Sequence, residues 1–325
     1  MENMTVNQTM MALLTRTTPL IVSRLVISKK MEPLRHENQY TKKYSLSSTR
    51  QITKLLYSDH KRPVKQKILS FYNFKGGTGK TSLSFQVATH LAILGFDVLC
   101  VDLDPQGHLS SVMGIPEDFN GDTMYDSLIN GVPIEETILN IADGLHLIPS
   151  NISTTRIEVQ LNLKNKREER LKELLDPLRE KYDFIILDTN PTISTLNMNA
   201  LVASDRINII CETQPFSLMG LRLLVSEMVS FFNDMKTIPN FCIVPNKYEI
   251  KTATAQEVLG ALRAEYSHYV LNAVVRKTEE INLSSKMKLP ISAFCKPKSL
   301  ALEDIMDLVH EIVSQSCGNS GLQAA

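Results

Sequence analysis

A glycine-rich stretch that could bind phosphate occupies Phe74–Ser82, with the sequence FKGGTGKTS. It follows an apolar run at 68–72 and precedes an apolar-periodic segment at 83–94, which predicts a strand, a tight turn and the start of a helix. The glycines allow backbone N–H groups to converge on one point, and the helix N-terminus adds partial positive charge there. Lys80 would reach the outer phosphates of a nucleotide, and the Thr81 hydroxyl would ligate Mg²⁺. The stretch therefore predicts a nucleotide site.

Carboxylates follow two further predicted strands, at the edge of the sheet where open α/β folds bind their ligands. Asp102 and Asp104 lie in the sequence VDLDPQG at 101–107, one helix after the glycine-rich stretch. One such acid can orient or deprotonate an attacking water, and the other can hold a water bound to Mg²⁺. Asp188 ends the apolar run at 184–187, which is typical of a Walker-B carboxylate near Mg²⁺. The alternative for Asp188 is a carboxylate that only caps the following loop.

Alternating strands and helices position these residues from Lys67 onward. Strands are predicted from apolar runs at 68–73, 98–102, 145–149, 183–188, 207–212, 240–245 and 270–275. Helices are predicted from the spacing of apolar residues at 82–95, 164–181, 217–233, 253–266 and 299–315. Because the strands are continuously apolar and separated by helices, we expect a mostly parallel sheet covered on both faces. The prediction is one doubly wound α/β domain of about 250 residues, at 67–315.

Charge is distributed unevenly along a chain whose formal net charge is zero. Residues 1–66 contain twelve Lys or Arg and four Asp or Glu, a net charge of +8, so the remainder carries −8. A basic arm on an acidic body is a pattern seen in nucleic-acid binders. Within the arm, the segment 46–59 predicts a short helix, and Arg50 and Lys54 on it are compatible with DNA contact. The alternative is a basic helix that packs on the main domain.

Three segments are therefore expected along the chain. They are a basic extension at 1–66, partly disordered and interpreted as carrying a small helical DNA-binding unit, the main domain at 67–315, and a flexible tail at 316–325.

The five cysteines share no CxxC spacing, which favours reduced thiols in a cytoplasmic protein. We expect no apolar run that approaches the ~18 residues of a membrane span. The stretch at 10–27 is interrupted by charge and proline, which is not typical of a signal peptide.

An additional lysine, Lys75, opens the glycine-rich stretch and distinguishes it from the general phosphate loop. The stretch KGGTGKTS occurs together with VDLDPQG, with FIILDTNP at 184–191 and with TQPFSLMGL at 213–221. This combination resembles the ParA branch of the MinD/ParA ATPases, the plasmid and chromosome partition proteins with a deviant Walker A motif. The resemblance covers residues 67–315 and implies a P-loop ATPase fold.

The resemblance also implies a role for each site residue. Lys75 would cross a dimer interface to the phosphates of the partner's ATP, which makes hydrolysis depend on dimerisation much as an arginine finger does. Asp104 would position the attacking water, so the catalytic residues would be Lys75, Lys80 and Asp104. Magnesium would be held by Thr81, Asp102 and Asp188. ATP would be bound by Lys75, Gly76, Gly77, Thr78, Gly79, Lys80, Thr81, Ser82, Gln214 and Asn246, the last of these at the adenine base.

DNA and a second protein are the partners that the resemblance implies. In this family, basic residues displayed on the ATP-bound homodimer bind DNA non-specifically, and Arg276 matches such an arginine. Lys277, Lys286 and Lys288 lie nearby in the sequence and could add phosphate contacts. A centromere-bound ParB-type partner would stimulate hydrolysis and release the dimer. The expected location is the cytoplasm, on the nucleoid, without membrane binding.

Three other functions would each require a particular feature in the sequence. A membrane-associated spatial regulator like MinD needs a basic amphipathic C-terminal helix, and the segment 315–325, QSCGNSGLQAA, contains neither Lys nor Arg. An electron-transfer relative of the nitrogenase iron protein needs paired cluster cysteines, which the spacing of the five cysteines does not provide. A DNA-binding repressor switched by ATP would use the basic extension to read a specific sequence.

Overall fold

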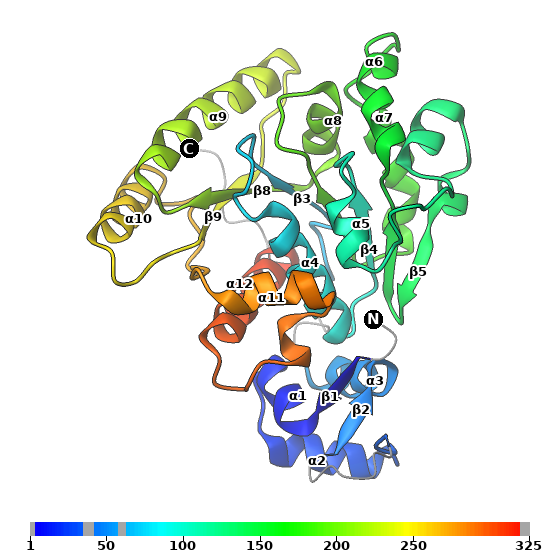
Figure 1. The fold of residues 1–325 in the computed structure, drawn as a ribbon, viewed down its shortest axis with the longest axis vertical. Helices are drawn as coiled ribbons and strands as arrows, with labels where there is room; N and C mark the ends of the chain where they lie inside the picture. Colours follow the sequence, from blue (N-terminus) through cyan, green and yellow to red (C-terminus); the bar gives the residue numbers. More distant parts are fainter. Residues whose placement is uncertain (1–3, 35–41, 58–62, 319–325) are drawn as a thin grey trace.

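A computed structural model describes residues 4–34, 42–57 and 63–318 of the chain. Its main feature is a seven-stranded sheet with helices on both faces (Figure 1). The strands are, in spatial order, β5 (Leu139–Ala142), β6 (Leu145–Ile148), β4 (Val98–Asp102), β7 (Phe184–Asp188), β3 (Ile68–Tyr72), β8 (Arg206–Glu212) and β9 (Phe241–Asn246). Neighbouring strands pair in parallel except β5 and β6, which pair antiparallel. The predicted doubly wound, mostly parallel α/β fold is confirmed.

Helices cover both faces because alternate residues of each strand point to opposite sides of the sheet. The helices of this domain are α4 (Lys80–Ile93), α5 (His108–Val112), α6 (Ile157–Leu161), α7 (Arg170–Leu175), α8 (Thr195–Ala203), α9 (Pro215–Asp234), α10 (Ala253–Glu265), α11 (Glu279–Met287) and α12 (Leu300–Cys317). Helices α4 and α12 share a core with Cys100 and Ile186. The residues between these in the strands, such as Leu99 and Ile185, pack with α6, α7 and α8 on the other face.

Two predicted elements differ from the structure. The helix predicted at 164–181 is broken, because α7 ends early and a 3₁₀ turn, Asp176–Glu180, follows it. Pro177 explains the break, since it lacks the N–H that a continuing α-helix would use. The segment predicted as a strand at 270–275 forms no regular ladder. Isolated bridges join Val270 to Ile243 and Arg276 to Tyr248, and the backbone N–H groups between them at Asn272 and Ala273 donate to the Glu311 carboxylate. The edge strand β5 and the helices α8 and α11 were not predicted.

Helix α9 corrects the expectation that no apolar segment reaches the length of a membrane span. Its 20 residues pass a test of length and hydropathy, as does the bent pair of the first two helices described below. The core helix of a globular domain passes the same test, so this is weak evidence for a span. In this fold Leu221, Leu224 and Met228 of α9 are buried in one cluster with Ile209 and Phe241 of the sheet.

A separate N-terminal unit lies at the bottom of Figure 1, below α11 and α12. Its elements are β1 (Thr5–Asn7), α1 (Gln8–Leu14), α2 (Pro19–Ser28), β2 (Lys43–Ser45) and α3 (Leu46–Leu56), with β1 and β2 antiparallel. The side chains of Asn7, Thr18 and Ser45 cap the three helices. Of the segment 1–45, expected to be partly disordered, residues 4–34 and 42–45 are folded. The rest, like most of the expected tail at 316–325, lies outside the described residues.

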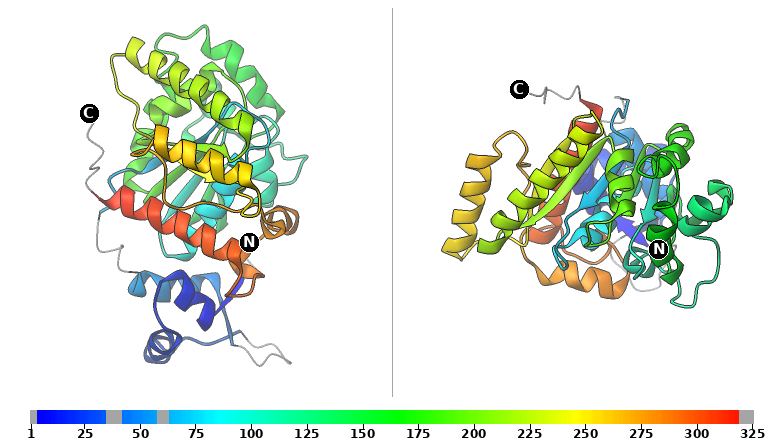
Figure 2. Two further views of the ribbon diagram at one scale, coloured as in Figure 1. Left: turned by 90° about the vertical axis from the view of Figure 1, so that its left-hand side faces the viewer. Right: turned by 90° about the horizontal axis from the view of Figure 1, so that it is seen from above.

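The N-terminal unit packs against the C-terminal end of α4 and against α12 (Figure 2). Arg50 of α3 is buried and donates to the carbonyl of Phe96 at 2.7 Å and to Asp97 at 2.8 Å. The Thr53 hydroxyl donates to the carbonyl of Ile93 at 2.6 Å. Thr53 thereby satisfies a carbonyl that α4 leaves unpaired at its end, and Arg50 satisfies acceptors in the segment that follows the helix. Arg50 is thus a packing residue and does not face DNA.

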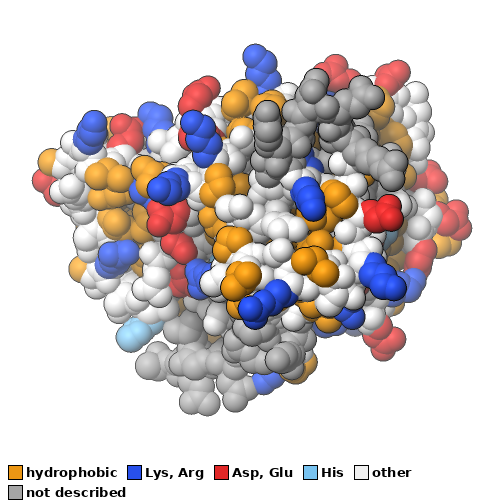
Figure 3. All heavy atoms as spheres, turned by 90° about the horizontal axis from the view of Figure 1, so that it is seen from below, with side chains coloured by type: hydrophobic (Ala, Val, Ile, Leu, Met, Phe, Trp, Pro, Cys, Tyr) orange, Lys and Arg blue, Asp and Glu red, His pale blue; other side chains and the backbone are white. Residues whose placement is uncertain are grey.

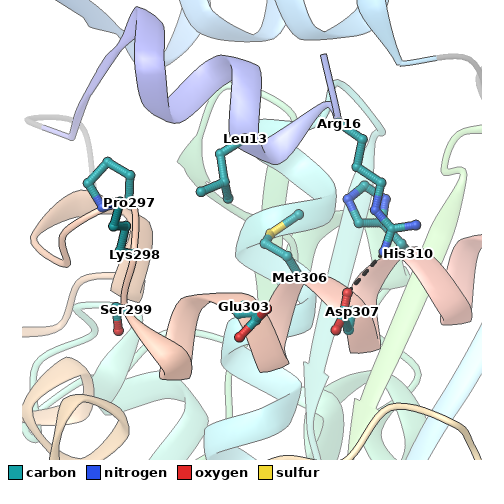
Figure 4. Close-up of a pocket in the computed structure, with 9 residues that line it drawn as sticks. All are labelled: Leu13, Arg16, Pro297, Lys298, Ser299, Glu303, Met306, Asp307 and His310. Atoms are coloured by element: carbon teal, nitrogen blue, oxygen red, sulfur yellow. Dashed lines mark hydrogen bonds and ion pairs between the residues drawn. The ribbon is translucent and has the colours of Figure 1, made fainter. Parts of the chain in front are cut away.

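A cavity of about 430 Å³ lies beside this contact, between the N-terminal unit and α12 (Figure 4). Leu13 and Arg16 line it on the N-terminal side, and Met306 and Asp307 line it on the side of α12. Arg16 donates to Asp307 at 3.0 Å across the junction. The two units are therefore joined by polar as well as apolar contacts.

Candidate functional site

The glycine-rich stretch forms the predicted turn between β3 and α4. Gly77 and Gly79 have φ angles of +74° and +94°, which residues with a side chain rarely adopt. A Cβ at Gly79 would also collide with the side-chain amide of Asn246. Helix α4 begins at Lys80, so its unpaired N-terminal N–H groups lie beside the turn. This is an arrangement that binds anions such as phosphate.

Two side chains at the end of β9 hold the turn. The Asn246 amide donates to the carbonyl of Thr78 at 2.7 Å, and the Lys247 ammonium donates to the carbonyl of Gly77. Because the C=O and N–H of one peptide group point in opposite directions, the fixed carbonyls aim the following N–H groups away from β9. Lys247 was not predicted, although a polar residue at the end of an apolar strand is a signal for this edge of the sheet.

Two buried acids lie side by side at this edge, because Asp102 and Asp188 are paired in register on β4 and β7. Asp102 accepts from the backbone N–H and the hydroxyl of Ser110 at 2.8 and 2.7 Å. Asp188 accepts from the Ser84 hydroxyl at 2.9 Å, whereas its other buried oxygen has no hydrogen-bond partner among the described residues. Burial raises the pKa of both acids, and the charge of Asp102 raises that of Asp188 further.

A magnesium ion fits the oxygen of Asp188 that lacks a partner. Burial raises the pKa of Asp188 and the Thr81 hydroxyl lowers it, so Thr81, in the first turn of α4, is the hydroxyl that would join Asp188 at the ion. Asp102 fits a supporting role better than direct coordination, since one oxygen serves Ser110 and the other accepts from the N–H of Asp104 at 3.1 Å. The described residues contain no cluster of three or more His, Cys, Asp or Glu that could hold a metal ion. Magnesium beside a nucleotide needs only one or two protein ligands besides phosphate and water.

Lys80 and Asp104 lie close to these acids, as predicted. Lys80 is 6% exposed, and its ammonium donates to the carbonyl of Lys75 at 3.2 Å. Burial lowers the pKa of Lys80, whereas the charges of Asp188 and Asp104 raise it. One Asp104 oxygen accepts from the backbone N–H of Gln106 at 2.9 Å. The edge therefore combines a cation for phosphate with a carboxylate that can orient water.

Lys75 has a different environment on the outer side of the turn. Its side chain is 47% exposed, and its ammonium pairs with Glu212 of the same chain at 2.7 Å. Glu212, the last residue of β8, also pairs with Lys247 at 2.8 Å. Burial raises the pKa of Glu212, but its bonds to the two lysines outweigh burial and lower it overall. Glu212 was not predicted, although it too ends an apolar strand.

The two predicted ATP-binding residues outside the glycine-rich stretch, Gln214 and Asn246, occupy different environments. Gln214 is exposed at the N-terminus of α9, where its side chain makes no capping bond. Asn246 is buried, and its amide serves the phosphate turn through Thr78. The structure thus gives Asn246 a function in the turn that the sequence did not reveal, and its contact with adenine stays a prediction.

The four predicted DNA contacts fall into two pairs. Arg276 donates to Asp304 at 2.7 and 2.9 Å and to Glu303 at 3.2 Å, and only 20% of its side chain is exposed. Lys277 pairs with Glu249 at 2.9 Å. Lys286 and Lys288, at the end of α11, are exposed and form no ion pair with another described residue. The acids therefore neutralise the first pair and leave the second available.

Comparisons with known proteins agree with this geometry. A family described as AAA domain matches residues 66–239. Cell division protein PomZ of Myxococcus xanthus is 32% identical over 246 residues, 75% of this chain and 76% of PomZ. The chromosome-partitioning ATPase Soj of Treponema pallidum is 31% identical over 230 residues, 70% of this chain and 90% of Soj.

Solved structures show the same fold. A plasmid partition protein of Borrelia burgdorferi, solved bound to AMPPNP, superposes with a TM-score of 0.65 at 23% identity, over 77% of this chain and 100% of that one. The predicted resemblance is thereby confirmed. From the matched domain and the two relatives, the chain belongs to the ParA/Soj family of AAA-domain ATPases.

Proposed function

We propose that this ParA-family partition ATPase binds ATP with Mg²⁺, forms a sandwich dimer that binds DNA non-specifically, and is released when a partner protein stimulates hydrolysis. The contrast between two lysines of one turn carries the proposal. Lys80 is buried among acids, whereas the side chain of Lys75 is 47% exposed on the outer side. One lysine can serve the chain's own nucleotide, and the other is accessible to a second subunit.

Each buried residue has a distinct role in this proposal. Lys80 would bind the outer phosphates, and Asp104 would orient or deprotonate the attacking water. Thr81 and Asp188 would hold Mg²⁺, which neutralises charge on the phosphates when it is bound. Asp102 would keep Ser110 and the backbone of Asp104 in place through the bonds described above.

An apolar surface beside the site supports a contact with a second subunit. Helix α9 begins at Pro215, three residues after Glu212, and three of its large side chains are turned to solvent. Phe216 is 86% exposed, Met219 is 74% exposed and Leu223 is 55% exposed. Clusters of exposed large apolar residues commonly mark protein interfaces.

DNA binding in three nucleotide states tests the proposal. The full chain would be titrated onto a random-sequence duplex with ATP, ADP or no nucleotide, over a salt series. We expect binding with ATP alone, and steep weakening as salt rises, because phosphate contacts release counterions. Binding that is equal in the three states would contradict the proposal.

A second candidate function, an ATP-switched repressor, is favoured by the geometry of the N-terminal unit. Helices α1 and α2 meet at 114° across a four-residue turn, and β1 and β2 form a small sheet beside them. Two helices at 90–120° joined by such a turn are the helix-turn-helix arrangement that reads duplex DNA. Basic and apolar side chains share the underside of the molecule (Figure 3). Arg24 of α2 and Lys29 and Lys30 after its C-terminal end are exposed.

Charge substitutions in the full chain separate the two DNA-binding functions. Replacing Arg24, Lys29 and Lys30 by alanine is expected to abolish preference for duplexes selected from a random pool, and to leave ATP-dependent non-specific binding in place. Replacing Lys286 and Lys288 by alanine is the matched control and is expected to do the reverse. If no sequence is enriched from the pool by the unaltered chain, the repressor function is excluded.

A further inference from the structure

We propose that Glu212 is a positioning residue that holds Lys75 over its own subunit and releases it to the second subunit on dimerisation. This inference rests on the proposed cross-subunit role of Lys75. It adds a competitor for that lysine within the same chain, at a position no motif of the site includes.

The carboxylate of Glu212 is shared evenly between two lysines. One oxygen lies 2.7 Å from the Lys75 ammonium, and the other lies 2.8 Å from the Lys247 ammonium. The Glu212 side chain is 6% exposed, so water cannot replace a lost partner easily. The group is nevertheless ionised, since its two cations lower its pKa.

The two lysines are not held equally. Lys247 has a left-handed backbone, with φ of +54°, and its ammonium also donates to the carbonyl of Gly77. The Lys75 ammonium has Glu212 as its one hydrogen-bond partner among the described residues, and nearly half of the Lys75 side chain is exposed. Lys75 is therefore the member that can leave.

Departure of Lys75 leaves no buried charge without a partner, because Lys247 remains on Glu212. Breaking a buried ion pair is normally costly since it strands one charge. Here the cost approaches that of an exposed pair, and a triphosphate on the second subunit offers Lys75 a stronger, charge-assisted acceptor. The ion pair with Glu212 therefore makes the transfer of Lys75 to the second subunit less favourable but does not prevent it.

Removing the charge of Glu212 should therefore favour the dimer. With Glu212→Gln, we expect the dissociation constant of the ATPγS-bound dimer to fall about two- to fivefold. This change corresponds to the free energy of a partly exposed ion pair. In a Lys75→Ala background the same substitution should change nothing. Sedimentation equilibrium of the full chain at saturating ATPγS and Mg²⁺ measures this.

Glu249→Gln is the matched control, since it removes the charge from the exposed pair of Glu249 with Lys277 and should leave dimerisation unchanged. An unchanged or weaker dimer for Glu212→Gln would overturn the inference. A Lys75→Ala chain that dimerises like the unaltered chain would instead overturn the proposed function.

A second variant decides the matter if Glu212→Gln does not fold. Lys247→Met leaves Lys75 as the one lysine on Glu212, so we expect a dimer weaker by about two- to fivefold at saturating nucleotide. A dimer as tight as, or tighter than, that of the unaltered chain would overturn the inference.

Discussion

The two ends of helix α4 show opposite solutions to the same problem of unpaired backbone groups. At its N-terminus, the turn at Phe74–Ser82 and Lys80 present donors and positive charge beside buried acids. At its C-terminus, Arg50 and Thr53 from the N-terminal unit donate to the carbonyls of Ala92 and Ile93. The first end is left for a ligand, and the second is completed by the protein itself. Polar groups of one helix can thus serve function at one end and stability at the other.

Lys80→Ala should have the largest effect and should act only at the ligand end. We expect no measurable affinity for ATP in isothermal titration, because the buried ammonium that is proposed to bind the phosphates is lost. Thermal unfolding without nucleotide should change little. Lys286→Ala, an exposed lysine of α11, is the control and should retain affinity. Nucleotide affinity close to that of the unaltered chain would refute the assignment of the site.

Asp104→Ala should separate binding from hydrolysis at the same end. We expect hydrolysis to slow by about 10²–10⁴-fold, because the carboxylate that is proposed to orient the attacking water is gone. The chain with ATP should then elute as a persistent dimer in size-exclusion chromatography. A chain that stays monomeric with ATP, or that hydrolyses ATP normally, would contradict this role.

Arg50→Ala should act at the other end of α4. It leaves the carbonyl of Phe96 and the Asp97 carboxylate without their buried donor, so we expect a loss of about 3 kcal/mol in the free energy of unfolding. Urea denaturation measures the change. Lys54→Ala, on the same helix but exposed, should cost less than about 0.5 kcal/mol. Equal stability of the two variants would show that Arg50 does not support α4.

His90, in the last turn of α4, should give the smallest effect. Burial lowers its pKa from 6.5 to about 4, so between these pH values the unfolded chain binds a proton that the folded chain does not. The unfolding free energy should therefore fall as pH drops below 6.5, by about 2 kcal/mol between pH 7 and pH 5 from this group. Urea denaturation of His90→Gln should show that much less dependence on pH, whereas exposed His108→Gln should match the unaltered chain.

The sequence predicted which residues meet at the carboxyl edge of the sheet, because the signals for this edge are local. Continuous apolar runs mark β3, β4 and β7. Asp102 and Asp188 end two of these strands, and the glycine-rich stretch that leads to Lys80 follows the third. Parallel strands then bring their carboxyl ends together without further information. The broken helix after Leu175 and the isolated bridges near 270–275 show where apolar spacing alone misleads.

The remaining contacts could not be predicted because they join distant segments. Lys75 and Glu212 lie 137 residues apart, and Arg50 and Phe96 lie 46 apart in different units. Arg276 shows the same limit, since a basic residue in a predicted DNA position is neutralised by Asp304 of α12. The sequence shows that a residue is charged, but the tertiary fold determines whether it binds a ligand or pairs with another side chain.

The amide of Asn246 has a consequence for the order in which the protein becomes competent during synthesis. It donates to the carbonyl of Thr78, 168 residues earlier in the chain, and occupies the space that any side chain at position 79 would need. A nascent chain that ends before β9 contains the whole glycine-rich stretch but lacks the group that holds it. The glycine-rich turn therefore acquires its final shape late in translation, and nucleotide binding at this turn would require β9 to be in place.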